Sequence, residues 1–296
     1  MLHYAVHLSG GLTSAWALKC AIEQKGVDNV TGYFADTKGK HADNEYAGED
    51  SDSYRLLKDL VKLLRFKLYR VADGRDIWEV MHDKRAIKIP QNDITPCSKA
   101  LKADVLDRVV RQHFPHGDVV HVFGMDWSEP HRIARLTQAF APDPVWFPLN
   151  ERPYVDKDTI KQWLRDSEIA IPKLYEYGFT HNNCGGFCVR AGKAHFVRLY
   201  FTFPDRYLYH EQKELDLCTY LGKRVTILRE RVNGETKTLT LRDFRERLDA
   251  AICLYPELRT LNVNGEQFQL LLKRAIKEYD PYDVGTCGCF LAGITK

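Results

Sequence analysis

The chain has 296 residues, enough for one large domain or for a main domain with a smaller appendage. Hydrophobic residues make up 44% and charged residues 28% of it, which excludes a collagen-like or intrinsically disordered chain. The formal net charge of +3 gives no argument for nucleic-acid binding, although a local basic groove is compatible with it.

Hydropathy and cysteine usage favour a cytoplasmic protein. No apolar run approaches the roughly 20 residues that span a bilayer. The apolar stretch after Met1 has no basic region before it and no cleavage site after it, so we expect neither secretion nor a membrane partner. In such a chain, 8 cysteines are better interpreted as metal ligands, reactive thiols or buried residues than as a disulfide framework.

Strands and helices alternate over the first half of the chain. Apolar runs predict strands at 2–8, 30–35, 66–71, 118–123 and 145–149, and helical spacing predicts helices at 15–22, 53–64 and 100–110. This alternation is typical of an α/β protein with a doubly wound, mainly parallel, Rossmann-like sheet. Ligands of such sheets bind beyond the carboxyl ends of the strands, where Ser9, Asp36 and Gly124 would emerge.

The pattern changes after Pro153. A helix is predicted over 157–166, followed by a loop over 178–192 that is rich in glycine, asparagine and cysteine. Alternating runs around Asn233 and Gly234 predict a β-hairpin within 225–241, and helices are predicted at 241–252 and 265–279. We therefore expect a main domain over 1–200 and a smaller α+β region over 201–296 that closes on the cysteine-rich loop.

A glycine-rich segment, Ser9-Gly10-Gly11-Leu12-Thr13-Ser14, separates the first predicted strand from the first helix. Glycines let the backbone approach phosphate oxygens, hydroxyls donate hydrogen bonds, and a helix N-terminus carries partial positive charge. The segment therefore indicates a phosphate-binding loop, and the alternative is a plain turn with a serine cap. It is not a Walker A loop, because the Gly-Lys-Ser/Thr ending is absent.

The motif Ser-Gly-Gly-x-x-Ser after the first strand resembles the signature of the PP-loop, or N-type ATP pyrophosphatase, superfamily. Three later segments resemble its phosphoadenosine phosphosulfate reductase-like branch: Phe34-Ala35-Asp36-Thr37, 96–102 and 123–132. The resemblance covers roughly the first 200 residues. It implies an adenine-nucleotide α-hydrolase fold for 1–200, adenosine near Asp36 and Thr37, and basic residues of 96–102 that face phosphates or substrate.

Motifs and resemblance together predict a site for ATP and Mg²⁺. The residues expected to bind them are Ser9, Gly10, Gly11, Thr13, Ser14, Asp36, Thr37, Gly124, Asp126 and Glu129. Those expected to act in catalysis are Ser9, Lys99, Arg132 and Cys97. Lys99, Lys102, Arg132 and Arg135 would neutralise the triphosphate and the leaving pyrophosphate. For each charged residue alone, the alternative is a solvated surface position.

Two close pairs of cysteines predict a metal site. Cys184 and Cys188 lie in the glycine-rich loop, and Cys287 and Cys289 lie near the C-terminus. Their four thiolates would hold Zn²⁺ or an iron–sulfur cluster, and the spacing does not identify the metal. The alternatives are a redox-active tail or thiols that only pack. His181 and His195 are candidate further ligands, and the alternative for each is a hydrogen-bonding group in a loop.

The remaining cysteines have simpler surroundings. Cys97 precedes Lys99 and Lys102, which favour a thiolate, so it is a candidate nucleophile or sulfur carrier; a small residue beside a turn is equally compatible. Cys20, Cys218 and Cys253 fall in helical patterns and are expected in the core.

The leading functional hypothesis is an ATP pyrophosphatase that converts ATP to AMP and pyrophosphate and so adenylates a substrate. The C-terminal Glu-Cys-Gly-x-His of the sulfonucleotide reductases is absent, and the arrangement is more similar to PP-loop enzymes that insert sulfur into tRNA or DNA. Expected partners are an acceptor (tRNA, DNA or a small molecule), a sulfur-donor protein and, in a homodimer, a second copy of the chain. The alternatives are a phosphoadenosine phosphosulfate reductase-like oxidoreductase and a nucleotide-binding module without turnover.

An aromatic and basic cluster between 198 and 210 has two interpretations. It contains Tyr200, Phe201, Phe203, Tyr207 and Tyr209, together with Arg198, Arg206 and His210. Such side chains stack bases in a nucleic-acid groove, or they form part of a core.

Overall fold

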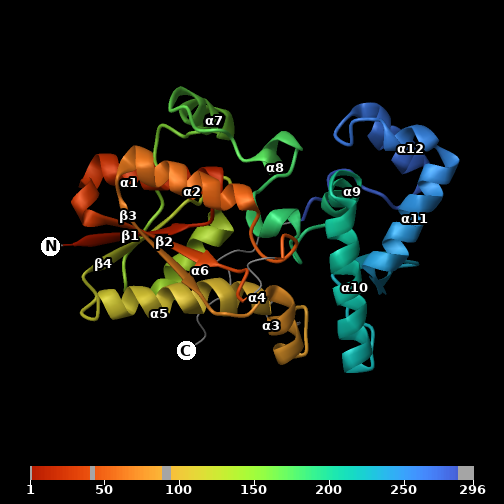
Figure 1. The fold of residues 1–296 in the computed structure, drawn as a ribbon, viewed down its shortest axis with the longest axis horizontal. Coiled ribbons are helices and arrows are strands. Elements are labelled where there is room, and N and C mark those ends of the chain that lie inside the picture. The colour runs from red at the N-terminus through yellow and green to blue at the C-terminus, as the bar shows by residue number, and fades with distance from the viewer. Residues whose placement is uncertain (1, 41–43, 89–94, 286–296) are drawn as a thin grey trace.

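The structure is a computed structural model that describes residues 2–40, 44–88 and 95–285 (Figure 1). Its centre is a five-stranded sheet in the order β3-β2-β1-β4-β5, with every neighbouring pair parallel. The strands are β1 (His3–Leu8), β2 (Val30–Asp36), β3 (Lys67–Ala72), β4 (Val119–Phe123) and β5 (Val145–Trp146). The predicted α/β fold with a doubly wound, Rossmann-like sheet is confirmed.

Helices cover both faces of this sheet (Figure 1). The face that presents Val6 and Leu8 packs on α1 (Leu12–Lys25), α2 (Ser51–Leu64) and α7 (Lys157–Asp166). The face that presents Ala5 and Phe123 packs on α5 (Asp104–His113) and α6 (Pro130–Phe140). Strands buried on both faces carry continuous apolar runs, which is why β2 and β4 are recognisable in the sequence.

The predicted helix at 100–110 is split in the structure. Its first residues belong to a π-helical segment, Lys99–Ala103, which continues directly into α5, and the short α4 (Pro96–Ser98) precedes the predicted range. The segment at 145–149 is a strand only over β5, followed by the 3₁₀ turn Pro148–Asn150. Helix α3 (Ile77–Lys84) lies between β3 and α4.

The second half of the chain is mainly helical. Its elements are α8 (Lys173–Glu176), α9 (Lys193–Thr202), α10 (Pro204–Leu221), β6 (Leu228–Val232), β7 (Glu235–Leu239), α11 (Leu241–Leu254) and α12 (Glu266–Ala275), with 3₁₀ turns at Asn183–Gly186 and Pro256–Arg259; another, Val27–Asn29, precedes β2. Strands β6 and β7 form the predicted hairpin, in which Asn233 and Gly234 have φ of 53° and 84°.

One hydrophobic core joins α3 to the helices α9 to α12. Trp78 and Met81 of α3 belong to the same buried cluster as Phe244 of α11 and Phe268 of α12. The boundary predicted at residue 200 falls inside α9, and the division into two domains stays a prediction.

The aromatic cluster around residue 200 is part of this core. Tyr207 is fully buried and its hydroxyl donates to the carbonyl of Leu241 at 2.7 Å. The rings of Phe201 and Phe268 lie 4.8 Å apart. Of the two interpretations given above, the structure therefore supports the core.

Two further expectations concern the burial of three cysteines and the presence of membrane-spanning helices. Cys20 and Cys218 are half-buried, whereas Cys253 is exposed, so its assignment to the core was wrong. Within the described ranges, no helix combines the length and apolar character that crossing a membrane requires.

Candidate functional site

The glycine-rich loop between β1 and α1 is held closed by its own serines. Ser14 Oγ donates to the carbonyl of Gly11 at 3.0 Å and accepts from the backbone N–H of Ser9 at 3.2 Å. Ser9 Oγ lies 3.1 Å from Ser14 Oγ. Gly10 has a φ of 71°, and a Cβ at this position would lie 2.8 Å from the Cβ of Ser53. The loop therefore bends tightly over the start of α1, as an anion cradle requires.

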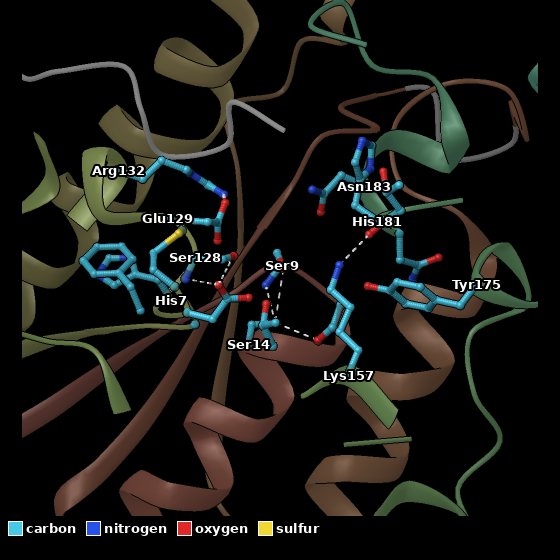
Figure 2. Close-up of a pocket in the computed structure, with 18 of the residues that line it drawn as sticks. His7, Ser9, Ser14, Ser128, Glu129, Arg132, Lys157, Tyr175, His181 and Asn183 are labelled. Carbon is cyan, nitrogen blue, oxygen red and sulfur yellow. Dashed lines mark hydrogen bonds and ion pairs between the residues drawn. The ribbon is translucent and has the colours of Figure 1, made fainter. Parts of the chain in front are cut away.

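A cavity of about 350 Å³ opens in front of this loop (Figure 2). It lies at the carboxyl ends of β1 and β4, the point where the strand order reverses and where sheets of this class bind ligands. Its lining includes Ser9, Gly11, Thr13, Ser14, Gly124, Asp126, Ser128, Glu129, His131, Arg132, Lys157, Tyr175, His181, Asn182 and Asn183. Most of the residues predicted to bind the nucleotide are thus brought together.

The end of β4 touches the loop directly. A Cβ on Gly124 would lie 2.5 Å from both the carbonyl carbon and oxygen of Thr13. Only a glycine allows this approach without displacement of the loop. Gly124 and the loop therefore form one continuous backbone surface at the floor of the cavity.

One wall of the cavity comes from the start of α6. Arg132 is buried and its guanidinium pairs with the carboxylate of Glu129. Asp126 accepts from the backbone N–H of Ser128 at 2.9 Å. Two carboxylates and a guanidinium therefore line the same side, a set of groups that suits phosphate oxygens bridged by a divalent cation.

The opposite wall comes from residues 157–183, far away in sequence (Figure 2). Asn182 Nδ2 donates to the carbonyl of Gly10 and to Ser53 Oγ, both at 2.9 Å. Tyr175 Oη accepts from the backbone N–H of Leu12 at 3.2 Å. Lys157 Nζ donates to the carbonyl of Thr180 at 3.2 Å. This wall is fastened to the glycine loop and adds a second cation to the cavity.

Histidine 181 belongs to this wall as a neutral group. Burial, and then the positive charges that neighbouring groups contribute, lower the pKa of His181 well below its usual range. Its ring stacks on His195 with centroids 5.1 Å apart. At neutral pH, His181 therefore offers hydrogen bonds to a ligand and no charge.

Gly10 is not among the residues that line this cavity, although its carbonyl accepts from Asn182, which does line it. Four more of the predicted site residues lie away from the cavity. Asp36 is buried, accepts from Tyr54 Oη at 2.6 Å and pairs with Arg70, whose Nε lies 2.8 Å from it. Lys99 Nζ lies 2.8 Å from Asp104 and faces a different hollow. Thr37 and Cys97 line a second, small cavity. The roles predicted for these four residues stay predictions.

The second cavity, of about 30 Å³, brings three cysteines together. Cys97, Cys184 and Cys188 line it with Thr37 and Lys102. Cys97 lies far from Cys184 and Cys188 in the sequence, so the sequence alone did not predict that the three are neighbours. Lys102, expected to face phosphates, is buried and pairs with Glu49 at 2.7 Å.

The carboxylate of Glu49 shapes the cysteine loop. It accepts from the backbone N–H of Cys184 at 2.6 Å. Cys184 has a φ of 50°, which is uncommon for a residue with a side chain, and Gly185 and Gly186 follow in the same left-handed region. The buried Lys102–Glu49 pair thus fixes an unusual backbone turn beside the thiols.

The four-thiolate site is not tested by the structure. Cys287 and Cys289 belong to the part of the chain that it does not describe. Within the described part, no three or more His, Cys, Asp or Glu side chains are arranged to hold a metal ion, so Cys97, Cys184 and Cys188 as placed do not fit one. Zinc or a cluster at Cys184, Cys188, Cys287 and Cys289 stays a prediction.

Comparison with known proteins adds no assignment. No protein-family model matches the chain, and no curated protein matches its sequence. The cavity and its lining residues are therefore the basis for assigning a function.

Several lining residues were missed by sequence reasoning. They are His7, Lys157, Tyr175, Thr180, Asn182 and Asn183. His181 was singled out only as a candidate metal ligand. The only sequence signal for part of this set was the glycine- and asparagine-rich loop at 178–192, which was interpreted for its cysteines.

Proposed function

We propose that this protein is a PP-loop ATP pyrophosphatase that adenylates a substrate. The observation that carries the proposal is the closed loop at Ser9 to Ser14, with Gly124 pressed against it at the switch point of the sheet and a cavity of about 350 Å³ in front. A loop of this kind binds phosphates through backbone N–H groups at a helix N-terminus. The cavity is of a size that accommodates a nucleotide.

The reaction is a displacement at the α-phosphorus. An oxygen of the acceptor attacks, a new oxygen–phosphorus bond forms, and the bond to the β-phosphate oxygen breaks, which releases pyrophosphate and leaves the acceptor as its adenylate. Arg132 and Lys157 line the cavity and would neutralise the developing charge. Mg²⁺, when bound, would add charge neutralisation, and the carboxylates of Asp126 and Glu129 are the groups that would hold it.

We propose that a second step transfers sulfur to the acceptor. A persulfide on Cys97, whose outer sulfur a donor protein supplies, would attack the activated carbon of the acceptor, form a carbon–sulfur bond and release AMP. A thiolate of Cys184 or Cys188 would then attack Cys97 Sγ and break the sulfur–sulfur bond, which frees the thiolated acceptor and leaves a disulfide that an external thiol reduces. Cys184 and Cys188 line the same small cavity as Cys97, which supports this exchange. This step depends on the adenylation step and is proposed with it.

Product analysis with α-labelled ATP tests the adenylation step. The wild-type protein with Mg²⁺ and candidate acceptors, both nucleic acids and small molecules, is expected to form AMP and pyrophosphate. Ser14→Ala is expected to lower this rate, and Ser51→Ala, on the exposed start of α2, serves as the matched control. Formation of ADP as the only product would contradict the proposal.

A further inference from the structure

Two large aromatic rings stack on each other in contact with water. The rings of Trp127 and Tyr154 have centroids 5.3 Å apart and planes 25° from parallel. Both are exposed, Trp127 to 52% and Tyr154 to 47%. An exposed stack of two large rings keeps apolar area in water, and such a surface more often marks a binding site than a structural contact.

This aromatic stack lies at the rim of the nucleotide cavity. Trp127 stands between Asp126 and Ser128, which both line the cavity. Tyr154 precedes α7 by three residues, and the first residue of α7, Lys157, also lines the cavity. The stack therefore borders the route by which an acceptor would reach the proposed phosphate loop.

One guanidinium group lies beside the stack, and further basic residues follow on α6. The guanidinium of Arg152 lies 5.6 Å from the centre of the Tyr154 ring. His131 and Arg135 are both exposed and lie one turn apart on α6, which begins just after Trp127. Neither Arg135 nor Arg152 pairs with a carboxylate of the described residues. The guanidinium of Arg152 is thus available to an anionic ligand beside the Tyr154 ring, and that of Arg135 is available farther along α6.

Each of the three nearby carboxylates accepts a hydrogen bond, but among the described residues only Glu129 is paired with a cation. Asp126 accepts hydrogen bonds from Ser128, Glu129 pairs with Arg132, and Glu151 accepts from Trp146 Nε1 at 2.6 Å. The rim therefore combines flat apolar rings with the guanidinium groups of Arg135 and Arg152, and it also holds the carboxylates of Asp126 and Glu151, whose donors are neutral. Flat rings and cations are the two components that bind single-stranded nucleic acids, in which bases stack on aromatic rings and phosphates meet cations.

We propose that the Trp127–Tyr154 stack is a platform for an unpaired base, and that the acceptor of this site is a single-stranded stretch of nucleic acid. The inference rests on the proposed function, because it names the acceptor class of the same cavity. Arg135 and Arg152 contact the phosphates that flank the stacked base. The aromatic cluster of residues 200–209 does not take this role, because its rings pack in the core.

Binding of fluorescently labelled oligonucleotides, measured by anisotropy without ATP, tests the platform. Single strands of RNA and DNA are compared with a duplex of the same sequence. Trp127→Ala is expected to weaken single-strand binding by about 5- to 150-fold, the range for loss of one base–aromatic stack. Trp127→Phe should retain most of the affinity. Tyr220→Ala removes an equally exposed ring on α10, 47% exposed, and should change nothing.

The role of Arg152 is tested separately by the salt dependence of oligonucleotide binding. Arg152→Gln is expected to lower the salt dependence of binding, with the slope of log K against log salt reduced by about 0.7. Equal binding by Trp127→Ala and wild type would overturn the proposal, as would equal affinity for single strand and duplex. Binding of an anionic peptide in place of oligonucleotides would overturn it too.

The two proposals fail separately. If ATP is split with a small-molecule acceptor while no oligonucleotide binds, the platform is wrong and the proposed function stands. If oligonucleotides bind in a Trp127-dependent way but ATP is never split to AMP, the platform stands and the proposed function is wrong.

Discussion

At the scale of single residues, the site depends on close backbone contact. Gly124 needs no left-handed φ, yet a Cβ there would lie 2.5 Å from Thr13 and 2.6 Å from the backbone nitrogen of Ser14. We expect Gly124→Ala to displace the loop, weaken ATP binding about tenfold and cost about 1–3 kcal/mol of unfolding free energy. Isothermal titration calorimetry measures the affinity for ATP, and urea denaturation measures the free energy of unfolding.

Gly265→Ala provides the control for this change. Gly265 also has no left-handed φ, and the nearest atom to its Cβ would be the carbonyl oxygen of Asn262 at 3.2 Å. The control should bind ATP as the wild type does. If Gly124→Ala also binds ATP normally, the loop and the end of β4 do not form a joint phosphate surface.

Ser14 is the second residue on which the loop depends. Its hydroxyl joins the backbone of Ser9 to that of Gly11. Each lost hydrogen bond of this kind costs about 0.5–1.5 kcal/mol, so Ser14→Ala should lower ATP affinity by about tenfold. Equilibrium binding of a labelled ATP analogue measures this affinity. An unchanged affinity would contradict the role of the Ser9–Ser14 loop as a phosphate-binding loop.

At the scale of elements, buried charges join α2, α10 and the cysteine loop. Asp50 caps α2, is 1% exposed, and lies 3.2 Å from Arg206 of α10. The guanidinium of Arg206 also donates to the carbonyl of Gly185. Without Arg206, the only cation paired with the buried carboxylate of Asp50 among the described residues is the 41% exposed Lys173, 3.4 Å away, so this loss is more costly than loss of a surface pair.

Arg206→Leu is therefore expected to lower the free energy of unfolding by about 3–5 kcal/mol in urea denaturation. Arg224→Leu is the matched control, because Arg224 is largely exposed and its pair with Asp243 should contribute less than about 1 kcal/mol. Similar losses in the two variants would show that the Asp50–Arg206 pair does not hold these elements together.

The elements themselves were predictable where periodicity was strong. The α7 bounds of 157–166 were predicted to the residue, and the hairpin followed from Asn233 and Gly234. Helices α9 and α10 were not predicted. Helix α9 buries four consecutive residues, 194–197, and so has no single apolar stripe. Helix α10 buries one stripe, but this stripe contains the polar residues Arg206, His210, Glu211 and Glu214, so it does not stand out as apolar in the sequence.

At the scale of the whole molecule, buried neutral histidines set a dependence of stability on pH. Burial lowers the pKa of His121 and of His195 to about 4. Below about pH 6.5 the unfolded chain binds protons that the folded chain does not, so stability falls as the pH is lowered from 6.5 toward 4. Each histidine should remove about 2 kcal/mol between pH 6.5 and pH 5.

Urea denaturation at pH 7 and pH 5 checks this. His121→Gln should show a smaller loss between the two pH values than the wild type, whatever its stability at pH 7. His116→Gln, at an exposed position, should keep the wild-type difference. An equal pH dependence in all three proteins would contradict the lowered pKa of His121.

The cavity was predictable only in part. Sheet topology alone brings together the segments that follow the ends of the neighbouring strands β1 and β4. These segments are the loop at Ser9, Gly124 and residues 126–132. The opposite wall depends on long-range contacts such as Asn182 to Gly10, which no local pattern encodes. Lys157 was therefore overlooked, and Lys99 was assigned to phosphates although its side chain pairs with Asp104 elsewhere.

A crystal structure with α,β-methylene ATP and Mg²⁺ tests the central claim most directly, because this analogue cannot be split at the proposed bond. We predict that its phosphates lie against the backbone N–H groups between Ser9 and Ser14, with Arg132 and Lys157 beside them. Phosphates bound elsewhere on the molecule, with this loop left without contact to them, would contradict the account.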